Sequence, residues 1–328
     1  MTGLLDFGCV PNANVTIVVD SISGMLAQSA ETVERFNRKP LLAEPGFAVW
    51  IELPSIDRRI LWDAGASATA LLGNLRRMKI DVGDVDTIAL SHGHWDHVGG
   101  LPEALRVVRR PPERKTFPAG TPDEDLLTYA WLEPVPVIVH PAAFRERWSF
   151  LDDGRRQGPM APTNRAEWKA LGAKIRETSE PHRLADGCWT TGYVPRKSFE
   201  TEGRSKQLRY RDGEQFLPDD IEDDQSIVLN IEGKGLVVVS GCAHAGIVNT
   251  VKYARRITGI ETVHAILGGF HLGRASEGEV ERTIEAIEAI GPAMIVPTHC
   301  TGFDAMRRFA NRMPEAFVLA TVGTRFSF

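Results

Sequence analysis

The sequence has no long apolar run and no basic stretch at its start. No segment reaches the roughly 18 consecutive apolar residues that a membrane-spanning helix needs, so we expect no membrane partner. The first twenty residues, MTGLLDFGCVPNANVTIVVD, contain no basic residue, and Asp6 and Pro11 interrupt their apolar residues. This pattern is unlike a secretory signal. We therefore predict a cytoplasmic protein.

Basic charge and cysteine are also scarce. The 328 residues include 38 Lys and Arg against 43 Asp and Glu, a formal net charge of −5. This balance gives no electrostatic reason to expect a nucleic-acid partner. The four cysteines, at positions 9, 188, 242 and 300, are far apart and form no CxxC pair. Such spacing is typical of reduced thiols in a cytoplasmic chain rather than of a disulfide framework.

What the sequence does contain is a series of short apolar runs with helix-like segments between them. Several runs are apolar almost throughout, as strands covered on both faces are. The predicted strands are residues 15–20, 47–53, 59–63, 86–91, 135–140, 226–232, 235–241, 262–269, 293–299 and 316–322. Apolar spacing and start signals predict helices at 67–79, from Pro102 onward, from Ser276 to Gly291 and at 301–313. The pattern indicates an α/β fold of packed sheets with helices outside, as a single domain over 1–328.

Two stretches inside this domain look irregular. Residues 110–134 are rich in proline and charge, and residues 192–225 read GYVPRKSFETEGRSKQLRYRDGEQFLPDDIEDDQ. A loop of the second length in a compact domain is usually a lid, an interface arm or disordered. We predict irregular insertions at both places.

Histidine is concentrated in one short segment, LSHGHWDHVGGL (90–101), which holds three of the nine histidines. Side chains alternate in extended chain, so His92 and His94 point the same way from the end of a predicted strand. Asp96 and His97 then face a point beside them, and one segment can serve two ions. Imidazole and carboxylate together suit zinc, and also iron or manganese. The segment therefore predicts a metal site.

The segment SHGHWDHVGG resembles the metal-binding signature of the metallo-β-lactamase superfamily, and the order of predicted elements is compatible over nearly the whole chain. The resemblance implies an αββα sandwich with its site at one edge of the sheets. It also implies a dinuclear centre, with His92 and His94 on the first ion and Asp96 and His97 on the second.

Two later strand ends offer further ligands. Cys242 and His244 follow one predicted strand in GLVVVSGCAHAGIVNTV, and His299 follows another in AMIVPTHCTG. The superfamily places a late ligand histidine after a strand near the C-terminus, and His299 matches it. We predict His244 for the first ion and His299 for the second. The alternative for each is a histidine that caps the following helix.

The chain departs from the common superfamily pattern at two points. CWTTGYVPR (188–196) lacks the histidine of the usual His-x-x-Gly-His stretch, and Cys242 stands where a strand usually delivers an aspartate that bridges both ions. Either Cys242 is a thiolate ligand that the metal deprotonates, or only water bridges the ions and Cys242 is a buried structural residue. The number of ions is left open by these departures.

These departures match a smaller group within the superfamily. SGCAHAGIVNTV, LGGFHL, VPTHCTG, TTGYVPR and AEPGFAVWIE together resemble metallo-β-lactamase-fold proteins of 7,8-dihydropterin chemistry. That group makes a ribofuranosylaminobenzene 5′-phosphate conjugate of a dihydropterin. A histidine commonly follows the AE of the last stretch in the group, and Pro45 stands there in this chain. The difference puts one substrate contact of the group in doubt.

Three more residues have predicted roles. Asp63, in ILWDAG, resembles the superfamily's early aspartate, which holds a ligand histidine or its loop in place; as the alternative it caps the helix at Ser67. His271, in LGGFHL, is predicted to contact substrate rather than metal, with a neutral core histidine as the alternative. Arg196 would bind an anionic substrate group if the irregular stretch folds over the site, and otherwise lies on the exposed surface.

The main hypothesis is a metal-dependent hydrolase of a phosphoester or cyclic ester. Zinc lowers the pKa of a bound water from about 15.7 to about 7 and so supplies hydroxide at neutral pH. Asp96 is the predicted catalytic residue, because it would orient this nucleophile while binding metal. The alternatives are a dihydropterin-related transferase and a metal-binding module without turnover. We expect two zinc ions, with manganese or iron as alternatives, and a small-molecule substrate; homo-oligomerisation is left open.

Overall fold

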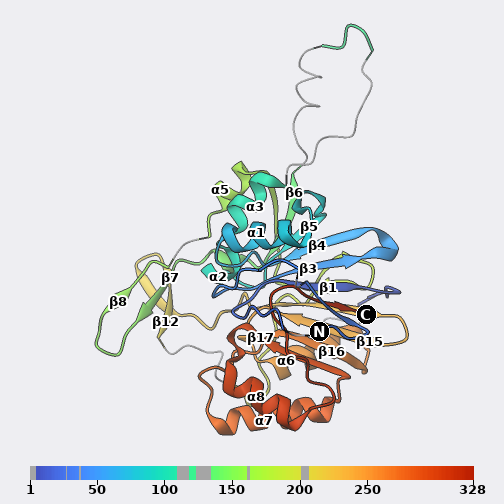
Figure 1. Ribbon diagram of the computed structural model, residues 1–328. Helices are drawn as coiled ribbons and strands as arrows, with labels where there is room; N and C mark the ends of the chain where they lie inside the picture. Colours follow the sequence, from blue (N-terminus) through green and yellow to red (C-terminus); the bar gives the residue numbers. More distant parts are fainter. Residues whose placement is uncertain are drawn as a thin grey trace.

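The computed structural model describes residues 5–26, 28–36, 38–108, 118–122, 134–160, 163–200 and 207–328. Two β-sheets packed face to face form its centre, and helices cover both outer faces (Figure 1). This arrangement confirms the predicted αββα sandwich. Of the irregular stretch predicted at 110–134, most lies outside the described residues. Among the helices of the described part of the chain, none is both long and apolar enough to cross a bilayer.

The first sheet has eight strands in the order β2-β18-β1-β3-β4-β5-β6-β9. These strands are β1 (Asn14–Val19), β2 (Val33–Arg35), β3 (Ala48–Leu53), β4 (Arg58–Trp62), β5 (Thr87–Ala89), β6 (Val135–Val139), β9 (Ala173–Glu177) and β18 (Thr324–Ser327). The second sheet has six strands in the order β10-β11-β14-β15-β16-β17. They are β10 (His182–Ala185), β11 (Cys188–Thr190), β14 (Ser226–Ile231), β15 (Gly235–Ser240), β16 (Val263–Gly269) and β17 (Met294–Thr298).

Helices lie on the outside of each sheet. The first sheet is covered by α1 (Ala68–Met78), α3 (Leu101–Val107) and α5 (Arg165–Ala170), and the second by α6 (Ile247–Thr258), α7 (Glu277–Ile290) and α8 (Phe303–Arg312). The short helix α2 (Trp95–Val98) follows β5, and 3-10 turns occupy η1 (Pro54–Ile56), η2 (Val82–Asp84), η3 (Pro141–Phe144) and η4 (His299–Thr301). The predicted start signal of α7 is present, since the Ser276 side chain accepts a hydrogen bond from the Glu279 N–H.

Strand β3 shows why the central strands read as continuous apolar runs. Val49 and Ile51 face the core between the two sheets, whereas Ala48 and Trp50 face the core beneath the helices of the first sheet. Both faces are buried, so the sequence shows no polar alternation. Each fully buried aliphatic side chain of this kind stabilises the fold by roughly 1.5–3 kcal/mol.

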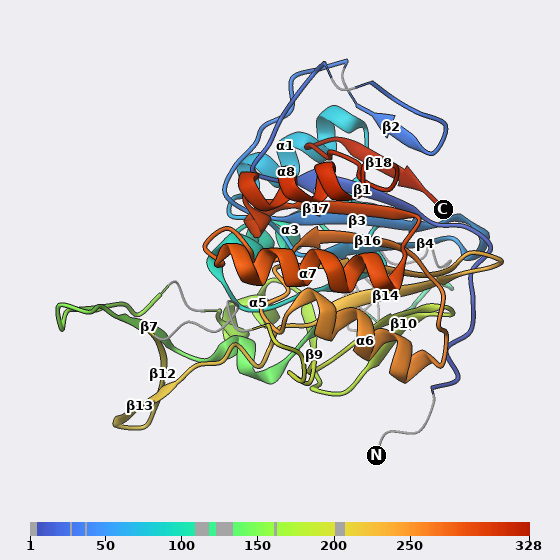
Figure 2. The same ribbon diagram turned by 90° about the horizontal axis from the view of Figure 1, so that it is seen from below.

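A third, four-stranded sheet projects from the sandwich (Figure 2). We call it the arm; its strands are β7 (Arg147–Phe150), β8 (Arg156–Gln157), β12 (Leu208–Asp212) and β13 (Gln215–Pro218). The expectation that 192–225 is irregular is therefore wrong for 208–218, which form a hairpin. An aromatic cluster holds the arm together: the Phe216 ring lies 5.7 Å from that of Trp148 and 5.1 Å from that of Phe150.

The prediction of a strand at 316–322 is also wrong. Only Phe317 makes an isolated bridge, to Ile295, and the true strand is β18. The chain here passes from the edge of the second sheet back to the first. Ala320 is buried in the core between the sheets, and Val318 is partly buried against that core, without either joining a ladder. Burial, rather than strand pairing, explains their apolar character.

Candidate metal centre

Segments from both sheets meet at one edge of the sandwich. The histidine-rich segment follows β5 of the first sheet, while Cys242 and His244 follow β15, His271 follows β16 and His299 follows β17 of the second. The structure brings all of the predicted metal ligands to this edge, where they form two groups of donors.

Group one consists of the imidazoles of His92, His94 and His244. The ring centroid of His92 lies 4.5 Å from that of His94 and 4.8 Å from that of His244. The ring centroids of His94 and His244 are 5.1 Å apart. The Nε2 atom of His92 lies 3.0 Å from Nδ1 of His94. The three rings therefore pack against one another, and the sequence predicts these same three residues for the first ion.

Group two consists of Asp96, His97 and His299. The Oδ2 atom of Asp96 lies 3.7 Å from Nε2 of His97 and 3.5 Å from Nε2 of His299. The rings of His97 and His299 are 5.0 Å apart between centroids. These are the same three residues that the sequence predicts for the second ion.

Cys242 lies between the two groups. Its Sγ atom is 3.1 Å from Nε2 of His97. Its thiol can form a ligand set with His92 and His244, with His97 and His299, or with His271 and Cys300. In each set the donor atoms lie within 4.8 Å of one another. This is the place that a bridging ligand would occupy. Burial, and the nearby Cys300, raise the pKa of the Cys242 thiol, whereas a bound cation would favour the thiolate.

Asp63 orients the histidine-rich segment. Its Oδ2 lies 2.7 Å from Nδ1 of His97 and accepts a hydrogen bond from the Ser91 hydroxyl at 2.7 Å, while its Oδ1 accepts from the Ser91 N–H at 2.7 Å. The carboxylate thus fixes the His97 ring with Nε2 toward the centre, the usual arrangement behind a metal-binding histidine. The helix start at Ser67 is capped by the Ser67 side chain itself, so Asp63 is not its cap.

The charges differ between the two donor groups. Burial lowers the pKa of His92 well below its usual value and that of His94 to about 4, so both rings stay neutral, the form that binds metal. Burial acts to raise the pKa of Asp96, but His97 and His299 outweigh it and hold the pKa well below its usual range. Burial acts to lower the pKa of His97, yet the carboxylates of Asp63 and Asp96 raise it to about 9.

Close backbone contacts and left-handed residues shape the centre. A side chain at Gly93 would place its Cβ 2.2 Å from the carbonyl oxygen of Ala143, so only glycine fits between the two ligand histidines. Four non-glycine residues at the centre have φ between 49° and 58°: Asp63, Ala243, His271 and His299. Such backbone is strained by about 1–3 kcal/mol per residue and clusters at functional sites.

The sequence analysis missed the acidic residues that hold the ligand loops. Asp223 accepts a hydrogen bond from the Gly93 N–H at 2.7 Å, and Asp224 accepts one from the Ala245 N–H at 2.9 Å. Asp20, at the end of β1, accepts one from the His299 N–H at 3.0 Å. Burial raises the pKa of both Asp20 and Asp224 to about 6. Each ligand-bearing loop therefore has its own carboxylate behind it.

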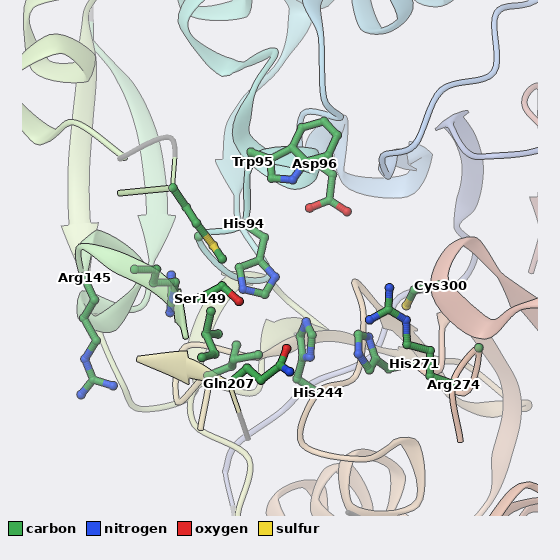
Figure 3. Close-up of a pocket in the computed structure, with 16 residues that line it drawn as sticks. His94, Trp95, Asp96, Arg145, Ser149, Gln207, His244, His271, Arg274 and Cys300 are labelled. Atoms are coloured by element: carbon green, nitrogen blue, oxygen red, sulfur yellow. The ribbon is translucent and has the colours of Figure 1, made fainter. Parts of the chain in front are cut away.

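A cavity of about 620 Å³ opens beside the centre (Figure 3). Figure 3 shows Trp95 and Asp96 on one side, with His271, Arg274 and Cys300 at one end and Arg145 at the opposite end. The arm contributes a further wall, since Ser149, Gln207 and Leu208 also line the cavity. A small molecule in this space would contact both the metal donors and the arm.

Two substrate contacts are predicted from the sequence, and the structure places them differently. His271 lines the cavity, with its ring 4.1 Å from that of His244. Arg196 requires a correction, because its guanidinium donates to the backbone carbonyls of His244 at 2.7 Å and Ile221 at 3.1 Å. These contacts hold two loops together and leave Arg196 outside the cavity lining.

The residues fit a bound cation. Buried ring nitrogens of His94 (Nε2) and His299 (Nδ1) have no hydrogen-bond partner among the described residues, although buried polar atoms normally have one. Five imidazoles, a carboxylate and a thiol make a donor set that zinc accepts. Nε2 of His299, which faces Asp96, is likewise without a hydrogen-bond partner in the described part of the chain, and an ion at group two would supply one.

Comparison with known proteins agrees with the fold and the site. Residues 42–299 match the family model of the metallo-beta-lactamase superfamily. The chain therefore belongs to the metallo-β-lactamase superfamily, as the histidine-rich segment predicts.

Relatives extend over the whole chain. The 7,8-dihydropterin-6-methyl-4-(β-D-ribofuranosyl)-aminobenzene-5′-phosphate synthase of Methanocaldococcus jannaschii is 28% identical over 330 residues, which cover 99% of this chain and 100% of the relative. An uncharacterised protein of the same organism is 30% identical over 285 residues, covering 87% of this chain and 94% of that protein. The predicted resemblance to the dihydropterin group is thus confirmed as a similarity of sequence.

Solved structures support the fold. The crystal structure of Tm1679, a metal-dependent hydrolase of the β-lactamase superfamily, gives a TM-score of 0.70 at 21% identity and covers 96% of this chain and 98% of that one. The metallo-β-lactamase fold protein YhfI from Bacillus subtilis gives a TM-score of 0.51 at 11% identity, with 97% and 100% covered.

Proposed function

We propose that this protein is a metal-dependent hydrolase that cleaves a phosphoester or cyclic ester in a small molecule. The observation that supports it best is the pair of donor groups, joined by Cys242, beside a cavity of about 620 Å³. Zinc ions held by these groups would supply Lewis acidity toward an ester or phosphoester oxygen. Manganese and iron are the alternative ions for the same donors.

Asp96 has the position of the catalytic residue in this proposal. It lines the cavity and stays ionised, because His97 and His299 hold its pKa well below the usual range. A carboxylate of this kind accepts a hydrogen bond from the attacking water and orients it toward the substrate. His271 lines the same cavity. In this proposal it contacts the bound substrate.

The test combines metal analysis with turnover. Purified protein loaded with zinc or manganese should hydrolyse bis(4-nitrophenyl) phosphate or a simple lactone, and elemental analysis should find metal. His92→Ala should lose both metal and turnover, because it removes a ring of group one. His182→Ala, on β10 away from the centre, is the matched control and should keep both. Bound metal without turnover of any ester class would refute the hydrolase and favour a metal-binding module.

A second function is favoured by the similarity over the full chain to a dihydropterin-related synthase. In that case the same centre would serve a transferase, with an aromatic acceptor in the cavity in place of water. A fluorescence titration with a 7,8-dihydropterin separates the two. Absence of saturable binding would favour the hydrolase; saturable binding followed by conjugate formation would favour the transferase.

A further inference from the structure

Arg147 carries an unused charged donor inside the protein. This residue begins β7 at the base of the arm, and its side chain is only 3% exposed. Its Nε donates to Asp219 at 2.7 Å, and its Nη2 donates to Asp223 at 2.5 Å and to the carbonyl of Ala142 at 3.3 Å. The buried Nη1 atom has no hydrogen-bond partner among the described residues.

An unpartnered guanidinium nitrogen is costly to bury. Arginine stays charged at any physiological pH, so Nη1 cannot be neutralised by losing a proton. Leaving a buried donor of a charged group unsatisfied costs about 1–3 kcal/mol or more. Because Asp219 and Asp223 fix the plane of the guanidinium, the two Nη1 N–H bonds have a set direction. This is a preorganised donor for an anionic oxygen.

The side chain that carries this donor lines the same cavity as the metal centre. Arg147 lines the cavity together with His94 and Asp96, and Ser149, two residues further along β7, lines it as well. Asp223 links the two sites directly, since one of its oxygens accepts from Arg147 and the other accepts from the N–H of Gly93 between the ligand histidines. A molecule that contacts Nη1 therefore lies beside the metal donors.

The other arginines near the cavity are less suited. Arg145 stacks on the Tyr210 ring at 4.1 Å and donates to Glu222 at 2.6 Å. Arg196 is held by backbone carbonyls, and Arg274 is exposed. Arg147 alone among these four combines deep burial, a fixed orientation and a nitrogen without a partner.

We propose that Nη1 of Arg147 binds an oxyanion group of the substrate, a phosphate or a carboxylate, that is distinct from the ester bond to be cleaved. The substrate class is then a small molecule with one reactive ester and a separate anionic group. Calling this molecule a substrate rests on the proposed function, whereas the anion site itself does not.

Binding of simple anions tests the proposal without turnover. Phenylphosphonate, benzoate and benzyl alcohol are titrated by calorimetry into the zinc-loaded protein and into Arg147→Lys, which keeps the charge but lacks Nη1. The dissociation constant of phenylphosphonate or benzoate should rise about tenfold to a hundredfold, the usual effect of losing a hydrogen bond to a charged group. The anion that loses more identifies phosphate or carboxylate as the ligand. Equal affinities of wild type and Arg147→Lys for both anions would overturn the proposal.

Two controls separate binding from a structural role. Arg274→Lys, at the end of the cavity where Figure 3 shows His271 and Cys300, should bind the anions as the wild type does. Asp219→Asn weakens the clamp on Arg147 but leaves Nη1 in place, so it should retain most of the affinity. If Asp219→Asn loses as much affinity as Arg147→Lys, Arg147 only positions the loops and the proposal fails.

A measurement on the wild type covers the case in which Arg147→Lys does not fold. A crystal structure of the zinc-loaded protein with phenylphosphonate or benzoate should place an anion oxygen at hydrogen-bond distance from Nη1. An anion bound only at the metal donors would overturn the proposal. Because these readouts are binding and position, failure of the hydrolase assay would leave them interpretable.

Discussion

At the scale of single residues, Cys242 is the most informative departure from the superfamily pattern. Its thiol lies within ligand distance of both donor groups, where other members have a bridging aspartate. A side chain added at Gly269 would lie 3.2 Å from the Cys242 Cα and 2.7 Å from the Cys300 Sγ. The nearest atom would be the carbonyl oxygen of Gly241 at 2.5 Å, so the glycine lets β16 lie close to the backbone that carries Cys242 and to the thiol of Cys300.

Replacing Cys242 tests whether it bridges the ions. Cys242→Ala should lower the bound zinc or weaken its affinity by about tenfold or more, since one donor to each ion is lost. Cys242→Asp should keep two ions, because a carboxylate restores the bridge. Elemental analysis and competition with a zinc-binding dye measure both. Unchanged zinc affinity in Cys242→Ala would instead identify Cys242 as a structural residue.

The side chains that gather in the two donor groups could be predicted from the sequence, whereas the residues that support them could not. His92, His94, Asp96 and His97 are close in sequence, and His244 and His299 follow recognisable strands, so local patterns reveal them. Arg147 and its partners Asp219 and Asp223 are more than 70 residues apart along the chain. The spacing of residues within a short segment cannot indicate a contact between such distant positions. The same holds for Asp20, whose partner His299 is 279 positions away.

At the scale of elements, helix α6 depends on a side chain from elsewhere in the chain. Its N-cap is Gly246, which has no side chain to accept hydrogen bonds. The carboxylate of Glu200 does so instead, accepting from the N–H groups of Val248 and Asn249, each at 3.0 Å. Because α6 begins three residues after His244, this contact also fixes one metal ligand.

We predict that Glu200→Ala lowers the free energy of unfolding by about 0.5–2 kcal/mol, the usual effect of losing a helix cap. Zinc affinity should fall as well, because the helix start that follows His244 becomes less ordered. Urea denaturation with and without zinc measures both effects. Glu214→Ala, in the exposed turn of the arm, is the control and should change neither. An unchanged unfolding midpoint in Glu200→Ala would contradict the capping role.

The arm is a second element whose loss should affect the cavity alone. Phe216→Ala removes the ring that packs on Trp148 and Phe150, so the arm should open more often. Amide exchange should speed up at 147–157 and 208–218, and KM should rise several-fold for any substrate found. Zinc content should stay at the wild-type level. A lower zinc content in Phe216→Ala would show that the metal centre depends on the packing of the arm.

The arm also shows where prediction of elements ends. Its strands have only two to five residues, with arginine and aspartate among them. Short strands of mixed polarity carry no clear periodicity. β12 pairs with β7, about 60 residues earlier, so neither strand could be identified without its partner. The central strands were visible because burial on both faces leaves long apolar runs.

At the scale of the whole molecule, the metal centre joins the two sheets. Group two takes Asp96 and His97 from beside the first sheet and His299 from the second. Ions bound there stabilise the packed sandwich by mass action, with about 2.7 kcal/mol at a free metal concentration one hundred times the dissociation constant.

Removal of metal should therefore lower the melting temperature of the protein by several degrees. A thermal scan of zinc-loaded and chelator-treated protein measures the difference. His299→Ala, which removes the donor that the second sheet gives to group two, should melt close to the chelator-treated wild type, and added zinc should raise its melting temperature far less. Identical melting curves with and without metal would mean that the donors hold no ion of structural consequence.

Strand β18, at residues Thr324–Ser327, is inserted between β1 and β2 in the first sheet. During synthesis, then, this edge of β1 stays open until a strand some 300 residues further along the chain has been made. An open strand edge is a site for aberrant pairing, and contacts between distant parts of a chain form slowly. Nascent copies of this protein are thus exposed to aggregation until β18 has been made, and a nonsense codon ahead of residue 324 would leave that edge permanently bare.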